Sequence, residues 1–232
     1  VAVGDLDISV GIDSKDEIGS LAASFNQLIS ETRAYARGAE LIGSGDYTPE
    51  VKVRSQADTL GMSLNNMKDN LKRLSEKNRR RIWLLTGNGE LNDTVRGEKD
   101  VRELAQDIIS RLTTYLGAQI GAIYLLESGR LVLSGTYAFH HRKENANQIE
   151  PGQGLVGQAA LEKKRIIFAE VPGDYARINS GIGNSSPKNI IVFPFEHEGQ
   201  LKGVLEIGSV KEFTDLQLEF LRLVADSIGV AF

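Results

Sequence analysis

The sequence contains no cysteine in 232 residues. Disulfides, thiolate metal sites, cysteine nucleophiles and thioether-linked cofactors are therefore excluded within these residues. There is also no apolar run near the length of about 18 residues that a membrane-spanning helix needs. The net charge is only -4, with 27 basic and 31 acidic side chains, so nothing favours a nucleic-acid partner.

The remaining composition, 41% hydrophobic and 25% charged, is typical of one or two soluble globular domains. The chain starts at Val1, with neither an initiator methionine nor a signal-peptide pattern. We therefore expect it to be a segment of a longer protein.

Apolar residues between positions 16 and 42 recur in alternating steps of three and four, with Thr32 as the one polar member. A heptad seam of this length predicts a helix that associates with partner helices, most simply in a parallel homodimer. Asp16 or Ser14 is expected to cap this helix, and Gly43 to end it. The seam positions singled out are Ile18, Leu21, Phe25, Leu28, Tyr35, Ala39 and Ile42.

The same pattern returns further along the chain. Asp58-Thr59-Leu60-Gly61 repeats Asp16-Glu17-Ile18-Gly19 at an offset of 42, and Val51 repeats Val10 at an offset of 41. Two similar helical units that share the helix at 16–42 are therefore expected. The second seam consists of Leu60, Leu64, Met67, Leu71 and Leu74.

These residues resemble a HAMP domain, a helix–connector–helix dimer that relays signals from membrane receptors. The resemblance rests on the Gly4-Asp5 start, the extended connector, the Asp-Glu-Ile-Gly element and Phe25-Asn26. It implies four-helix bundles of a parallel homodimer, with transmembrane segments upstream. We assign residues 1–28 to the second half of one HAMP domain, 29–74 to a second HAMP-like domain and 75–97 to a helical linker.

From position 119 onward the pattern is that of strands alternating with helices. A helical region at 83–116, interrupted at Gly87, Gly89 and Gly97, precedes it. The order of elements predicts an α+β module, an antiparallel sheet packed with helices. The expected elements are strands at 119–126 and 130–139, a helix at 154–163, a strand at 165–169, a long loop at 170–188, strands at 189–195 and 200–208, and a helix at 214–232.

This module resembles a GAF domain over residues 98–232. The similarity lies in the segment 153–159, Pro194, the segment 203–206 and the start of the last helix at 213–216. HAMP-like repeats followed by a GAF-like module are similar to the sensory portion of bacterial hybrid sensor histidine kinases. The resemblance implies a non-catalytic cytoplasmic part of an inner-membrane protein, with a kinase domain downstream. The alternatives are the sensory half of a nucleotide cyclase or of a transcriptional regulator.

Two motifs could suggest bound groups. The segment 152–157 matches the GxGxxG pattern of dinucleotide sites, but no hydrophobic strand leads into it, so we expect its glycines to make a turn and a close helix contact. His140, His141 and His197 have no helical partner histidine or cysteine that would complete a zinc site. We expect no metal and no cofactor; the alternative is a GAF sensor that binds a metal or a haem, the latter ligated by His140.

The best candidate for a ligand site is the long loop at 170–188, because loops of this length in compact domains often cover binding sites. The GAF resemblance places it over the pocket of that fold, where an unidentified small molecule could bind. The alternative is a loop over an empty pocket. The candidate ligand-binding residues are Tyr137, Arg142, Tyr175, Arg177 and Asn179.

Overall fold

The structure is a computed structural model that describes residues 4–97, 99–138, 147–169, 171, 178–180 and 183–232. It divides into two compact units, residues 1–79 and 80–232, and helix α2 contributes to both. The helices are α1 (Glu17–Gly43), α2 (Thr59–Val95), α3 (Val101–Tyr115), α4 (Gly154–Glu162) and α5 (Asp215–Ala231). The strands are β1 (Ile120–Glu127), β2 (Arg130–Tyr137), β3 (Gln148–Ile149), β4 (Ile166–Ala169), β5 (Ile178–Ser180), β6 (Gly183–Ser185), β7 (Asn189–His197) and β8 (Gln200–Ser209).

Helix α1 has the ends that its sequence predicts. The Asp16 carboxylate accepts hydrogen bonds from the backbone N–H groups of Ile18 and Gly19, both at 3.1 Å, which caps the first turn. At the other end, Ser44 closes the last turn and Gly45 has a φ of +91°, a left-handed conformation that glycine adopts without strain. The predicted helix at 16–42 is therefore confirmed.

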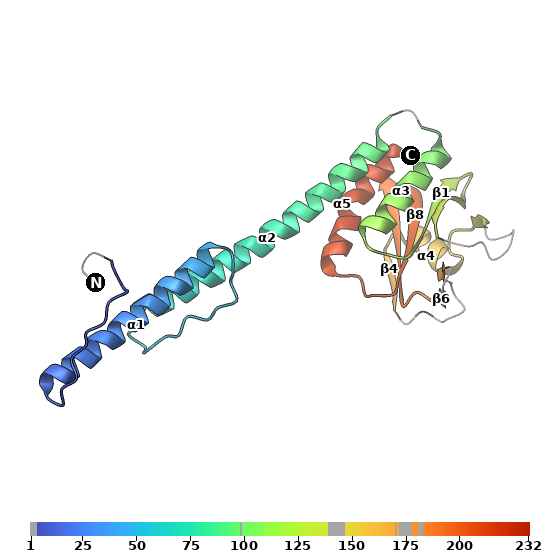
Figure 1. The fold of residues 1–232 in the computed structure, drawn as a ribbon. Coiled ribbons are helices and arrows are strands. Elements are labelled where there is room, and N and C mark those ends of the chain that lie inside the picture. The colour runs from blue at the N-terminus through green and yellow to red at the C-terminus, as the bar shows by residue number, and fades with distance from the viewer. Residues whose placement is uncertain (1–3, 98, 139–146, 170, 172–177, 181–182) are drawn as a thin grey trace. The chain divides into compact units, whose positions relative to one another are not determined.

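The core of the first unit lies between α1, the connector that follows it and the first part of α2. Figure 1 shows the two helices side by side. Tyr35, Ile42 and Val51 are buried there, at 7%, 1% and 7% exposure. The half-buried side chains packed against them are Tyr47, Leu64 and Leu71.

Helix α2 does not break at Gly87 or Gly89, so the predicted interruption at these two glycines is wrong. The helix continues to Val95. A glycine costs a helix only about 1 kcal/mol, which tertiary packing can offset. The segment predicted as a linker is helical, but its last part is a core element: Leu91 is fully buried in the second unit.

The second unit is a six-stranded antiparallel sheet with the order β3-β2-β1-β8-β7-β4. Helices α3 and α5 and the end of α2 pack on one face, and α4 packs on the other (Figure 1). The sheet with helices on it confirms the predicted α+β class. Within the loop predicted at 170–188, β5 and β6 form a separate two-stranded sheet. No helix among the described residues is long and apolar enough to span a membrane.

The GxGxxG segment forms a turn into α4. The N–H of Gly152 donates to the carbonyl oxygen of Gly157 at 2.7 Å. A β-carbon at Gly157 would lie 2.3 Å from the carbonyl oxygen of Glu150, so only glycine fits there. Before this turn comes only the two-residue edge strand β3, which is not the buried strand of a dinucleotide site.

Candidate functional site

The two connectors are held to the helices by the same hydrogen-bond pair. The Asn26 side-chain amide donates to the carbonyl oxygen of Val10 at 3.0 Å, and its oxygen accepts from the Val10 N–H at 2.8 Å. Asn65 makes the same two bonds with Val51, at 2.7 and 3.2 Å. Each asparagine thus satisfies both backbone groups of one connector residue, as a neighbouring β-strand would.

This shared geometry supports two related helical units. Asn26 follows Phe25 and Asn65 follows Leu64, so the two asparagines occupy similar places in sequence. Their offset of 39 differs from the offset of 42 between Asp16 and Asp58, which makes the correspondence imperfect by sequence alone. The hydrogen bonds identify the equivalent residues directly.

Asp58 is the most constrained charged residue of the first unit. Its carboxylate accepts hydrogen bonds from the Arg54 side chain at 3.2 Å, from the Tyr35 hydroxyl and from the Gly61 N–H at 3.0 Å. Its side chain is only 2% exposed. Arg54 also pairs with Glu31 at 2.8 Å and lies over the Tyr35 ring, with 4.9 Å from its central carbon to the ring centroid. The cluster joins α1, the second connector and the start of α2.

We expect this cluster to make the first unit sensitive to acid. Hydrogen bonds from Arg54, and next from Tyr35, hold the pKa of Asp58 well below its ordinary value of 3.8. Because the folded-state pKa is lower than the unfolded one, the stabilisation is complete above the unfolded pKa and is lost as the pH falls through the folded pKa. An Asp58→Asn variant should therefore be less stable than the parent chain at neutral pH, by a margin that shrinks below about pH 4.

Urea unfolding of both proteins, followed by circular dichroism between about pH 7 and pH 3, measures that margin. Asp69→Asn is the matched control, because Asp69 lies on α2, the helix that Asp58 immediately precedes, and its side chain is 70% exposed. If the loss of stability caused by Asp58→Asn stayed constant with pH, it would contradict a lowered pKa of Asp58 in the folded state.

The predicted seam residues divide into two groups. Tyr35 and Ile42 are buried inside the chain itself, and Ala39, Leu64 and Leu71 are half-buried. The other seven are exposed, although they are large and apolar. These are Ile18 (54%), Leu21 (67%), Phe25 (36%), Leu28 (49%), Leu60 (52%), Met67 (41%) and Leu74 (53%).

Three aromatic rings join α2 to the rest of the second unit. Trp83 of α2, Tyr115 of α3 and Phe220 of α5 have ring centroids 4.9 to 5.2 Å apart. The Tyr115 hydroxyl donates to the carbonyl oxygen of Trp83 at 2.6 Å. Burial raises the pKa of Tyr115 above its ordinary value of 10.0, so the hydroxyl keeps its proton and remains a donor.

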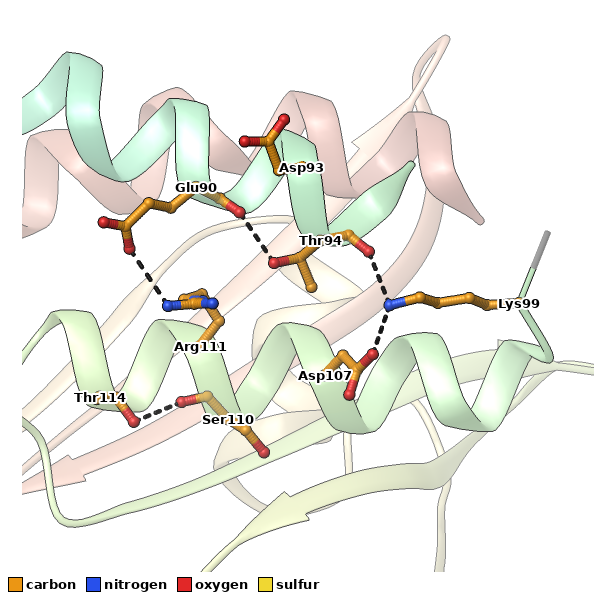
Figure 2. Close-up of a pocket in the computed structure, with 8 residues that line it drawn as sticks. All are labelled: Glu90, Asp93, Thr94, Lys99, Asp107, Ser110, Arg111 and Thr114. Carbon is orange, nitrogen blue, oxygen red and sulfur yellow. Dashed lines mark hydrogen bonds and ion pairs between the residues drawn. The ribbon is translucent and has the colours of Figure 1, made fainter. Parts of the chain in front are cut away.

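A polar groove of about 580 Å³ runs between α2 and α3 (Figure 2). Its two cations already have carboxylate partners: Arg111 pairs with Glu90 at 3.4 Å, and Lys99 with Asp107 at 2.6 Å. Lys99 also donates to the carbonyl oxygen of Thr94. Because both positive charges are balanced within the chain, we interpret this groove as a helix–helix contact and not as an anion site.

On the opposite face of the sheet, a carboxylate lies at the centre of an apolar surface. Glu206 of β8 is flanked across the sheet by Ala122 of β1 and Val192 of β7, and the Tyr124 hydroxyl lies 3.3 Å from a carboxylate oxygen of Glu206. The sequence offered a signal: Glu206 is the one charged residue between Gly203 and Ser209. The hydrogen bond gives both polar side chains a partner within this apolar face.

Of the predicted ligand residues, Tyr137 lies on the other face of the sheet from this pair. Tyr137 pairs with Gly121, whose added β-carbon would contact Thr113 and Ile109 of α3, so Tyr137 faces α3 and not the Glu206 side. Asn179 lies in β5, opposite Asn184 of β6. The predictions at Arg142, Tyr175 and Arg177 fall outside the described residues.

Two of the three histidines, His140 and His141, also lie outside the described residues. The third, His197, is the last residue of β7. Within the described ranges, no three side chains of histidine, cysteine, aspartate or glutamate gather as metal ligands.

Comparison with known families places two domains on the chain. The GAF domain profile matches residues 98–232, more than half of the chain, and the HAMP domain profile matches residues 1–34. A protein of Acetivibrio thermocellus that carries the provisional name of sensory transducer protein is 37% identical over 69 residues, which is 30% of this chain and 12% of that protein. The chain thus spans about an eighth of the length of this relative.

Solved structures with a similar fold are GAF domains. A GAF domain of A. aeolicus in an inactive state is 20% identical, with a TM-score of 0.51 over 66% of this chain and 97% of its own. The GAF domain of a Coxiella burnetii phosphoenolpyruvate-protein phosphotransferase is 18% identical, with a TM-score of 0.54 over 65% and 92%. fRMsr of Staphylococcus aureus in complex with substrate is 20% identical, with a TM-score of 0.51 over 64% and 94%.

At these identities the structural likeness shows the fold alone. The two profile matches also indicate a role, because HAMP and GAF domains are regulatory domains of sensory proteins. The chain is therefore part of a sensory signalling protein. It belongs to the GAF domain family and carries a HAMP domain at its N-terminal end.

Proposed function

We propose that this chain is a non-catalytic relay within a membrane-anchored sensor histidine kinase and works as a parallel homodimer. Its HAMP helices pass a conformational change to the GAF unit, which adds an input of its own. Two packings of the helical bundle with similar free energy would be the two signalling states.

The observation that carries this proposal is the exposed part of the seam on α1 and α2. Seven large apolar side chains at heptad spacing remain exposed in the single chain. A second copy in parallel would bring each of them next to its own equivalent and remove the apolar surface from water. Within the GAF unit, Leu223 and Val230 on α5 are also exposed apolar side chains at heptad spacing, by 43% and 65%.

Cysteine cross-linking tests the dimer cleanly, because the chain has no cysteine of its own. Phe25→Cys and Met67→Cys should each give a disulfide-linked dimer under mild oxidation, since residues beside a two-fold axis come within disulfide reach of their copies. Gel electrophoresis without reducing agent, with cross-linking followed over time, is the measurement.

Ala23→Cys is the matched control for Phe25→Cys. Ala23 is also exposed on α1, but two residues away, which turns it by about 200° around the helix. It should cross-link much more slowly than the seam position. Equal rates at positions 23 and 25, or a chain that stays monomeric at high concentration, would refute the parallel dimer.

The parent protein is the second part of the proposal. The order of HAMP before GAF supports a cytoplasmic portion that follows transmembrane segments and precedes a kinase domain. The coding sequence on both sides of the chain tests this. A histidine-containing dimerisation helix and an ATP-binding domain agree with it, whereas a cyclase or DNA-binding domain contradicts it.

A further inference from the structure

Helix α2 contains a stretch that by itself favours a turn. Residues 86–89 read Thr-Gly-Asn-Gly, and Asn-Gly is among the strongest turn signals. Each glycine inside a helix costs about 1 kcal/mol relative to alanine. All four residues are nevertheless helical. Packing must hold this part of α2 in a conformation that its local sequence opposes.

Only one of the two glycines has a packing reason. A β-carbon at Gly87 would lie 2.3 Å from the Tyr115 ring and 2.7 Å from the Phe220 ring, so a larger residue cannot fit. A β-carbon at Gly89 would meet no atom of the described part of the chain within 4 Å. Gly89 therefore weakens the helix without allowing any closer contact.

The hydrogen-bond ladder of α2 is shared with another helix at this place. In a regular α-helix the N–H of Gly87 donates to the carbonyl oxygen of Trp83. Here the Tyr115 hydroxyl donates to that same carbonyl at 2.6 Å. The Trp83 carbonyl therefore has a hydrogen-bond partner on another helix, α3.

Asn88 adds a second sign of strain. Its side-chain carbonyl oxygen is buried and has no hydrogen-bond partner among the described residues. Leaving such a group unpaired costs about 1–3 kcal/mol, a cost that disappears when the oxygen reaches water or a donor. The helical state of residues 86–89 thus carries a penalty that an opened state would not.

We propose that residues 86–89 are a hinge in α2, kept helical by the Trp83, Tyr115 and Phe220 rings and opened when these rings repack. Sequences that oppose their own fold locally are expected at functional places. The hinge lies where the helix that begins in the first unit joins the GAF core, so its opening changes how α2 leaves that core. It is a property of the single chain and needs neither the dimer nor the kinase assignment.

Distances between spin labels on α2 test the hinge. A Glu76→Cys and Asp93→Cys pair spans it, and the absence of native cysteine makes the labels specific. A straight helix puts the two positions about 25 Å apart along its axis. We expect a second, shorter population in the parent chain. Gly89→Ala should reduce it about fivefold, the factor that corresponds to about 1 kcal/mol of helix propensity.

A Ser63→Cys and Arg79→Cys pair is the matched control, with nearly the same spacing on the same helix but no hinge between the labels. It should give one narrow population with or without Gly89→Ala. Dilution with unlabelled chain removes distances between two copies. One narrow population near 25 Å for the 76/93 pair in the parent chain would overturn the hinge, and so would a second population that Gly89→Ala leaves unchanged.

Discussion

Replacing Phe220 with alanine should lower the free energy of unfolding of the second unit by about 3–5 kcal/mol, the cost of removing a fully buried phenylalanine. Phe220 is 1% exposed and belongs to the larger core cluster of that unit. Its ring also lies 5.2 Å from Trp83 and 5.0 Å from Tyr115. The substitution therefore weakens the core and the attachment of α2 together.

Urea unfolding measured by tryptophan fluorescence can follow this loss, because Trp83 is the one tryptophan in the chain. The midpoint should fall while the slope with denaturant stays unchanged. Phe232→Ala is the matched control: that ring is half-buried at the end of the same helix, 6.1 Å from Phe195. It should lose less than half as much stability, and equal losses would contradict the central role of Phe220.

The elements that sequence predicts well are those whose signals are local. Helix α1 could be located because Asp16 caps it, a heptad seam runs along it and glycine follows its end. The β1–β2 hairpin could be located because Ser128 and Gly129 make a two-residue turn between β-branched and aromatic runs, and both have positive φ. No distant residue is needed to decide either element.

The prediction at Gly87 and Gly89 failed because the deciding contact is distant. Tyr115 and Phe220 cover Gly87 from two other helices, and no pattern within α2 indicates them. Local preference favoured a break, and tertiary packing won. The same contacts that make the prediction fail are those that hold the proposed hinge.

The candidate sites also divide into those that local sequence predicts and those that depend on distant contacts. The exposed seam was predictable from its spacing, whereas the Asp58 cluster was not, because Tyr35 lies 23 residues before Asp58 and meets it only when α1 and α2 pack. Glu206 could have been found as a lone carboxylate in an apolar strand. Its pairing with Tyr124, 82 residues away, required the order of strands in the sheet.

Gly229→Ala is expected to destabilise the second unit by up to about 3 kcal/mol, the upper end of what overpacking a core costs. A β-carbon there would lie 2.1 Å from the carbonyl oxygen of Glu196 and 2.7 Å from its carbonyl carbon. Carbon and oxygen atoms normally stay more than about 3.3 Å apart, so α5 would have to rise by roughly 1 Å from β7. The contact atoms are main chain, and Glu196 is paired with Leu201 of β8, which limits how far they can move aside.

Gly89→Ala in α2 is the same substitution with the opposite expectation. No atom lies within 4 Å of its added β-carbon, so the gain in helix propensity of about 1 kcal/mol is not offset by a clash. Urea unfolding of the two variants should therefore shift in opposite directions from the parent chain. If Gly229→Ala raised the urea midpoint as Gly89→Ala does, helix propensity alone would decide its effect on stability. Opposite shifts would mean that Gly229 sets how closely α5 lies on the sheet, while Gly89 has no packing role in α2.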